Sequence, residues 1–275
     1  MQIAITRAPE PDLEPAGSRS HDWEGIDPER ALDQHEAYEN LLTELGCLVR
    51  RLPPRPPLPD SIFVEDTAVV LDNIAIITRP GAASRRGETG DVARILAAYR
   101  ELHRIKPPGT LDGGDVLPVG QTLFTGVSEQ TNQFGIAQLS HIVDAFGYRV
   151  KPVPLRHCRH LKSAVTRIGP ELVLANPDWV DIKPFTGLGI IEVDSREPTA
   201  ANALLLQNTV IYPDEFPYTR HRLEAGGIHV RNLPASELIA VRGGVTCCSL
   251  IFPVRGSNGH LVPIHEFDAL TIETT

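Results

Sequence analysis

Four short segments of the chain carry the side chains that could do chemistry. The first segment, residues 59–66, contains three carboxylates: Asp60, Glu65 and Asp66. Asp66 directly precedes an apolar run, so its charge needs a partner once the run is buried. A planar cation such as a guanidinium satisfies two carboxylates through paired hydrogen bonds. The segment therefore predicts a guanidinium-type site, and a solvated turn is the competing interpretation.

The second and third segments supply an acid and a histidine. Asp112 is followed by Gly113 and Gly114, which permit a tight bend that could aim a carboxylate inward, although a plain Asp-Gly turn is common. A histidine in residues 157–163 is a candidate general base or metal ligand. The run His157-Cys158-Arg159-His160 also suggests zinc, but no second Cys or His pair with metal-ligand spacing accompanies it. The sequence therefore disfavours a metal site.

The fourth segment, residues 241–249, contains two adjacent cysteines after a Gly-Gly turn. A thiol at the start of an apolar strand is placed like a nucleophile, and strand alternation would turn only one of Cys247 and Cys248 toward a site. Most free cysteines are small buried hydrophobes, which is the plain alternative. With a histidine and an acid elsewhere in the chain, cysteine nucleophilic catalysis becomes a reasonable hypothesis.

Composition excludes several classes of function. The 275 residues include 26 Lys and Arg against 35 Asp and Glu, a net charge of −9, with no long basic run. Binding to a nucleic-acid backbone needs clustered positive charge, so it is not expected. We also find neither an apolar run of about 18 residues nor a signal peptide. We therefore expect a soluble cytoplasmic protein that consists of one domain, residues 1–275, and acts on a small molecule.

The elements that must position these residues recur along the chain. Paired apolar runs around a turn predict hairpins at 68–78, 116–126, 163–178 and 203–212, and a last strand at 246–254. Helical periodicity covers 28–45, 89–102, 131–146 and 216–225. Short strands are expected at 47–52, 148–154 and 228–233.

A unit of hairpin, helix and strand therefore repeats about every 40–50 residues, which gives five units. Alternation of strands and helices favours a mixed α/β ring over an all-β propeller. The four chemistry-bearing segments fall at the ends of these units, where loops would converge at the mouth of the ring. An ordinary open α/β sheet is the alternative fold.

Six segments in this order resemble the dimethylarginine dimethylaminohydrolases of the guanidine-modifying, or pentein, superfamily. They are SIFVEDTAVV, ITRPGAASRR, LDGGDV, GVSEQTNQFG, HLKS and GGVTCCS. The resemblance extends from about residue 30 to residue 252. It implies a five-bladed α/β propeller, the pentein fold, in agreement with the five units.

The resemblance also implies roles for individual residues. Cys247 matches the nucleophile, His160 the general acid and base, and Asp112 the acid that orients His160. Three carboxylates, Asp60, Glu65 and Asp66, match those that hold the polar groups of the substrate. Arg85 matches an arginine that binds the α-carboxylate of the substrate, and Val241 occupies a position where the backbone contacts the ligand.

One position departs from the family. Gln130 stands where the family often has an arginine that also holds the α-carboxylate, which leaves Arg85 or Arg86 for that group. Residues 12–23 match the region of the family's flexible lid. These differences leave the exact substrate open.

The implied activity is hydrolysis of dimethylarginine or monomethylarginine to citrulline and a methylamine through a covalent intermediate on Cys247. The partner is a small guanidino substrate; no metal or organic cofactor is expected, zinc would act only as an inhibitor at Cys247, and a homodimer stays open. The alternatives are an amidinotransferase, an arginine deiminase or a hydrolase of another guanidino compound. A non-catalytic guanidinium-binding protein is the alternative from another class.

Overall fold

Five three-stranded sheets with one topology make up the fold. The computed structural model describes residues 1–9, 25–55 and 58–254, so the expected lid at 12–23 lies outside the described residues. In each sheet the central strand pairs antiparallel with the first strand and parallel with the third. The predicted repeat of hairpin, helix and strand is therefore confirmed.

Four of the sheets use consecutive strands, and the fifth joins the two ends of the chain. The consecutive strands are β3 (Ala68–Val70), β4 (Ile74–Ile77) and β5 (Glu101–Arg104); β6 (Val116–Val119), β7 (Thr122–Val127) and β8 (Arg149–Pro154); β9 (Val165–Gly169), β10 (Leu172–Ala175) and β11 (Gly189–Glu192); β12 (Leu204–Leu206), β13 (Thr209–Pro213) and β14 (Val230–Leu233). The fifth sheet pairs β15 (Leu250–Pro253) with β1 (Gln2–Arg7), which pairs with β2 (Cys47–Leu52).

Helices provide the crossovers that parallel strand pairs require. They are α1 (Pro28–Glu44), α2 (Thr89–Leu96), α3 (Gln133–Asp144) and α5 (Pro217–Ala225), whereas β10 and β11 are joined through the 3₁₀ turn η6 (Lys183–Phe185). The side chain of Asp27 caps α1 by accepting a hydrogen bond from the Arg30 N–H at 3.2 Å. The predicted helix at 89–102 was too long, because residues 101–104 are extended and pair with β4 as β5.

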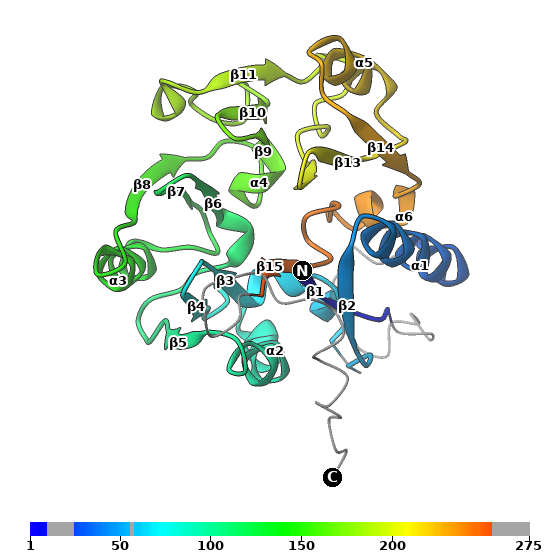
Figure 1. Cartoon of the computed structure of the whole chain (residues 1–275). Coiled ribbons are helices and arrows are strands. Elements are labelled where there is room, and N and C mark those ends of the chain that lie inside the picture. Colours follow the sequence, from blue (N-terminus) through cyan, green and yellow to red (C-terminus); the bar gives the residue numbers. More distant parts are fainter. Residues whose placement is uncertain (10–24, 56–57, 255–275) are drawn as a thin grey trace.

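The five sheets are arranged as blades around a common centre (Figure 1). The first strands of neighbouring blades contact one another: β15 contacts β3, β6 contacts β9, and β9 contacts β12. Helices α1, α2, α3 and α5 lie on the outside of the ring (Figure 1). This is the five-bladed α/β propeller expected from the sequence, and it excludes the open sheet.

The apolar core lies between neighbouring blades, which explains why the ring closes. One cluster packs Val69 and Ile76 of the β3–β5 blade against Val116 and Leu123 of the β6–β8 blade. Equivalent clusters fill the other four junctions, including the two on either side of β1. A blade buries both of its faces only when it has a neighbour on each side. A closed ring of five blades gives every blade two neighbours. Among the described helices, none is long and apolar enough to cross a membrane.

Candidate active site

Each blade contributes a polar residue from the segment just before its first strand. Asp66 in η3 (Val64–Thr67) precedes β3, and Asp112 precedes η5 (Gly113–Asp115) and β6. His160 precedes α4 (Leu161–Ala164) and β9, Asn202 precedes β12, and Cys247 precedes β15. Because the five blades repeat one topology, equivalent positions gather at one end of the ring. Residues more than 180 positions apart therefore form one site.

Asp112 and His160 form a buried acid–histidine pair. Nε2 of His160 lies 3.1 Å from Oδ2 of Asp112, which is completely buried. The Gly81 N–H donates to Oδ1 of Asp112 at 3.0 Å, so the carboxylate is fixed in place. Among the described residues, Nδ1 of His160 has no hydrogen-bond partner. This ring nitrogen is therefore free to exchange a proton with a ligand.

Close packing explains why glycines follow Asp112, which the sequence alone did not show. A Cβ on Gly113 would lie 1.9 Å from the Glu65 carbonyl oxygen, and a Cβ on Gly114 would lie 2.8 Å from Oδ1 of Asp66. The Gly114 N–H donates to that same Oδ1 at 3.0 Å. The glycines therefore let η5 pack directly against η3, which brings Asp66 and Asp112 to the same histidine.

Acidic neighbours give His160 an unusual pKa. Burial alone would lower the pKa of its imidazole, but Asp66, Asp112 and Asp115 together raise it to about 9. Oδ1 of Asp66 lies 3.9 Å from Nε2 of His160. Burial would raise the pKa of Asp66, but His160, Arg85 and the Gly114 N–H lower it to about 2. The resting site therefore contains an imidazolium beside the ionised carboxylate of Asp66 at neutral pH.

We expect the protein to lose stability as the pH rises through 9, because of His160. Its pKa is raised from 6.5 to about 9 on folding. Its contribution to the free energy of unfolding is therefore complete below pH 6.5 and is lost as the pH rises past the folded pKa. The loss is roughly 3 kcal/mol. Urea unfolding at several pH values between 6 and 10 would measure it. Against this prediction would stand a His160→Gln variant with the same decline as the unmodified protein.

Arg85, which the resemblance matches to an arginine that binds the substrate carboxylate, contacts protein groups in this structure. Its side chain is 4% exposed. It donates to Oδ2 of Asp66 at 2.5 Å, to the carboxylate of Glu88 at 2.8 Å, and to the carbonyl oxygens of Asp60 and Phe63. The pKa of Arg85 is raised, since Asp66 and Glu88 outweigh the effect of its burial. Arg85 therefore neutralises and orients Asp66 in this structure.

Glu65 is held by a relay that reaches the cysteine. Nζ of Lys162 donates to Oε1 of Glu65 at 2.6 Å, and Oγ1 of Thr246 donates to Oε2 at 2.9 Å. Thr246 Oγ1 in turn accepts a hydrogen bond from the Asn202 amide at 3.0 Å. The Glu65 N–H donates to the Cys247 carbonyl oxygen at 3.1 Å, so a backbone hydrogen bond holds the two residues next to each other.

The two cysteines occupy different environments. Cys247 is half-buried and lines a cavity, whereas Cys248 is completely buried in the core between two blades. The predicted reason was wrong, because both residues lie in a turn and the strand begins only at Leu250. Burial raises the pKa of the Cys247 thiol, and Glu65 and Asp66 raise it further. The resting thiol is therefore protonated and needs an added positive charge to ionise.

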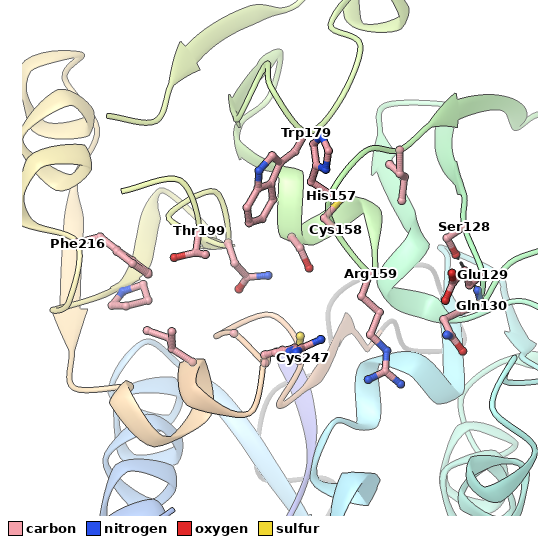
Figure 2. A pocket seen from close by; sticks show the side chains of 18 of the residues that line it. Ser128, Glu129, Gln130, His157, Cys158, Arg159, Trp179, Thr199, Phe216 and Cys247 are labelled. Carbon is pink, nitrogen blue, oxygen red and sulfur yellow. Dashed lines mark hydrogen bonds between the residues drawn. The ribbon is translucent and has the colours of Figure 1, made fainter. Parts of the chain in front are cut away.

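The cavity beside Cys247 has a volume of about 960 Å³. Its lining combines polar residues of the β6–β9 region, including Gln130 and Arg159, with apolar Trp179 and Phe216. Figure 2 shows these side chains around the space that Cys247 faces. A small molecule that occupies the cavity can therefore contact the thiol.

Comparisons with known proteins agree with this geometry. A protein of Pseudomonas aeruginosa named N(G),N(G)-dimethylarginine dimethylaminohydrolase is 36% identical over 225 residues, which cover 81% of this chain and 89% of that protein. The chain belongs to the dimethylarginine dimethylaminohydrolase family. A Streptomyces coelicolor protein of the same name is 35% identical over 249 residues, 90% of this chain and 95% of the other. No protein-family model matches the chain.

A solved structure extends the likeness to three dimensions. A mutant of the Pseudomonas aeruginosa dimethylarginine dimethylaminohydrolase, in complex with citrulline, aligns with a TM-score of 0.84 and 35% identity. The alignment covers 90% of this chain and 98% of that one. The fold is thus that of the dimethylarginine dimethylaminohydrolase family.

For this member of the dimethylarginine dimethylaminohydrolase family, the structure brings most of the predicted site together. Asp66, Asp112 and His160 are in mutual contact, and Glu65 lies beside Cys247. Asp60 is half-buried in η2 (Pro59–Ile62) next to Arg85, and Gln130 lies on the cavity wall. Val241 is buried at the end of α6 (Ser236–Ala240) and follows the cavity-lining Ile239 by two residues. The roles proposed for all of these residues stay predictions.

Two residues of the site, Lys162 and Asn202, were not among those expected from the sequence. Lys162 could have been found, because a buried glutamate such as Glu65 needs a cation. Asn202 directly precedes the hairpin at 203–212, the position that carries site residues in the other units.

One group of side chains has the geometry to hold a metal ion. Within the described part of the chain, ligand atoms of Asp66, Asp112 and His160 all lie within 4.8 Å of one another. All four carboxylate oxygens already have hydrogen-bond partners: Gly114 and Arg85 bind Asp66, and Gly81 and His160 bind Asp112. This is the arrangement of a satisfied acid–base network, in which a metal would compete with four existing contacts.

Proposed function

We propose that this protein hydrolyses Nω-methylated arginine to citrulline and a methylamine. The observation that carries the proposal is the Cys247 thiol, which lines a cavity and lies near the carboxylates of Glu65 and Asp66. Asp66 in turn contacts His160, which forms a hydrogen bond with Asp112. The citrulline bound by the Pseudomonas aeruginosa relative is the expected product and supports the same chemistry here.

Substrate binding would activate the thiol. The carboxylates of Glu65 and Asp66 already bind Lys162 and Arg85. Each carboxylate oxygen can accept a second hydrogen bond, so both groups would also bind the guanidinium of the substrate and place its central carbon near Cys247. The positive charge of the guanidinium offsets the carboxylates that raise the pKa of Cys247. A neighbouring cation lowers the pKa of a thiol. The thiolate would therefore form only when the correct cation is bound, which protects Cys247 from other electrophiles.

Two displacement steps would follow. On substrate binding the Cys247 thiol releases its proton to solvent, because His160 is already protonated. In the first step the thiolate forms a C–S bond with the guanidino carbon, and the C–N bond to the methylated nitrogen breaks as the His160 imidazolium donates a proton to it. In the second step His160 accepts a proton from water, which attacks the same carbon. The C–S bond then breaks, which leaves the ureido oxygen of citrulline and restores Cys247. Oxidation states do not change, and these steps need only the side chains and water.

The test is a ureido-product assay on purified protein with four substrates in parallel. We expect citrulline from dimethylarginine and monomethylarginine, and little or none from arginine. Turnover of arginine would indicate an arginine deiminase. Product from only the decarboxylated compound would indicate that the substrate is a guanidino compound without a carboxylate. A folded protein with a reactive Cys247 that converts none of them, the decarboxylated compound included, would overturn the proposed activity.

A further inference from the structure

Arg159 is a cation in the cavity, and its side chain forms no hydrogen bond or ion pair with the residues that the structure describes. It lies one residue before His160 and lines the cavity together with Gln130 and Cys247. Figure 2 shows its guanidinium extending into the space between these two residues in that view. Its Nε is shielded from solvent and donates no hydrogen bond to any residue that the structure describes. A shielded guanidinium N–H without a hydrogen bond is costly, so a ligand atom is the natural partner.

The other candidate cations near the site are already engaged. Arg85 binds Asp66 and Glu88, and Arg86 donates to the carbonyl oxygens of Pro80 and Gly81. Lys162 neutralises Glu65.

Two further charged residues line the cavity. Arg242 is exposed and has an interaction within the protein. Glu129 is exposed on the same wall and would repel an anion, so a cation is needed there for an anionic ligand to bind.

We propose that Arg159 binds the carboxylate of the substrate and thereby takes over the role that Gln130, a neutral amide, cannot supply. The inference rests on the proposed function, because it assigns the second end of the same substrate. The planar guanidinium of arginine matches a carboxylate through two parallel hydrogen bonds. With its cationic end at Glu65 and Asp66 and its anionic end at Arg159, the substrate would be fixed at both ends, and guanidines without a carboxylate would bind weakly.

The test compares Arg159→Gln with Arg156→Gln. Arg156 is exposed, is not part of the cavity lining, and carries the same charge three residues earlier. Binding of monomethylarginine and of its decarboxylated analogue is measured by calorimetry in the Cys247→Ser background, where no turnover interferes. We expect Arg159→Gln to weaken the binding of monomethylarginine about ten- to a hundredfold and the binding of the analogue by less than about twofold. Arg156→Gln should change neither.

Each other result overturns the inference. An equal loss of affinity for both ligands would show that Arg159 has a structural role. An unchanged affinity for monomethylarginine would show that Arg159 does not face the carboxylate. The same selective loss should appear in KM for the variant with Cys247 intact, with kcat retained. If the protein binds monomethylarginine through Arg159 but never releases citrulline, the proposed hydrolysis fails while the assignment of Arg159 stands.

Discussion

Replacing Cys247 with serine is expected to reduce citrulline formation by about 10⁴-fold or more. A serine hydroxyl has nearly the size of the thiol but ionises far less readily, and the carboxylates of Glu65 and Asp66 oppose its ionisation further. The neighbouring thiol cannot substitute, because Cys248 is completely buried and its Sγ faces the Gly244 carbonyl oxygen at 3.8 Å. The measurement is kcat with dimethylarginine. Mass spectrometry of the unmodified protein during turnover then tests for a substrate-derived group bound covalently to Cys247.

The matched control is the neighbouring cysteine. Cys248→Ala removes a thiol from the core and should cost about 1–2 kcal/mol of stability, while kcat per folded molecule stays within about threefold. Cys248→Ser keeps the size but introduces a buried hydroxyl, so it should be the less stable of the two variants. A Cys248 variant that folds and loses all turnover would show that the nucleophile has been assigned to the wrong residue.

Much of the fold was predictable because its signals are local and repeated. Paired apolar runs with a turn between them identified four of the hairpins, and the capping residues Asp27 and Pro28 identified the start of α1. The errors fall where a tertiary contact decides the conformation. Residues 101–104 have helical periodicity but pair with β4, and residues 246–249 have strand-like composition but form the turn that holds Cys247 in the cavity.

The site was predictable in its residue types but less so in its pairings. The residue types indicated four candidate segments, with Asp66 and Asp112 in two of them. The resemblance to the family then singled out His160 among the histidines and Cys247 from the pair of cysteines. Which carboxylate receives which cation depends on distances across blades, which one sequence does not contain. Arg85 was therefore expected to face the ligand, whereas the structure places it against Asp66 and leaves Arg159 to face the cavity.

Replacing Asp112 with asparagine is expected to lower kcat/KM by about 10²–10⁴-fold. The asparagine oxygen can still accept the Gly81 N–H that Oδ1 accepts now, so the backbone should hold. The new NH₂ group would face Nε2 of His160 as a donor, which favours the wrong tautomer, and the negative charge that helps to raise the pKa of His160 would be lost. The alkaline limb of the pH profile should therefore move from near pH 9 toward lower pH, which can be measured from pH 6 to 10.5.

Asp112→Glu separates the charge of Asp112 from its position. The extra methylene in a completely buried site should cost about 1–3 kcal/mol of stability. The retained charge should keep the alkaline limb close to its original pH even if the rate falls. An asparagine variant whose limb does not move would show that Asp66, 3.9 Å from His160, dominates the raised pKa and that Asp112 acts through position alone. Direct titration of the His160 imidazole by NMR in both variants measures that division of roles without relying on turnover.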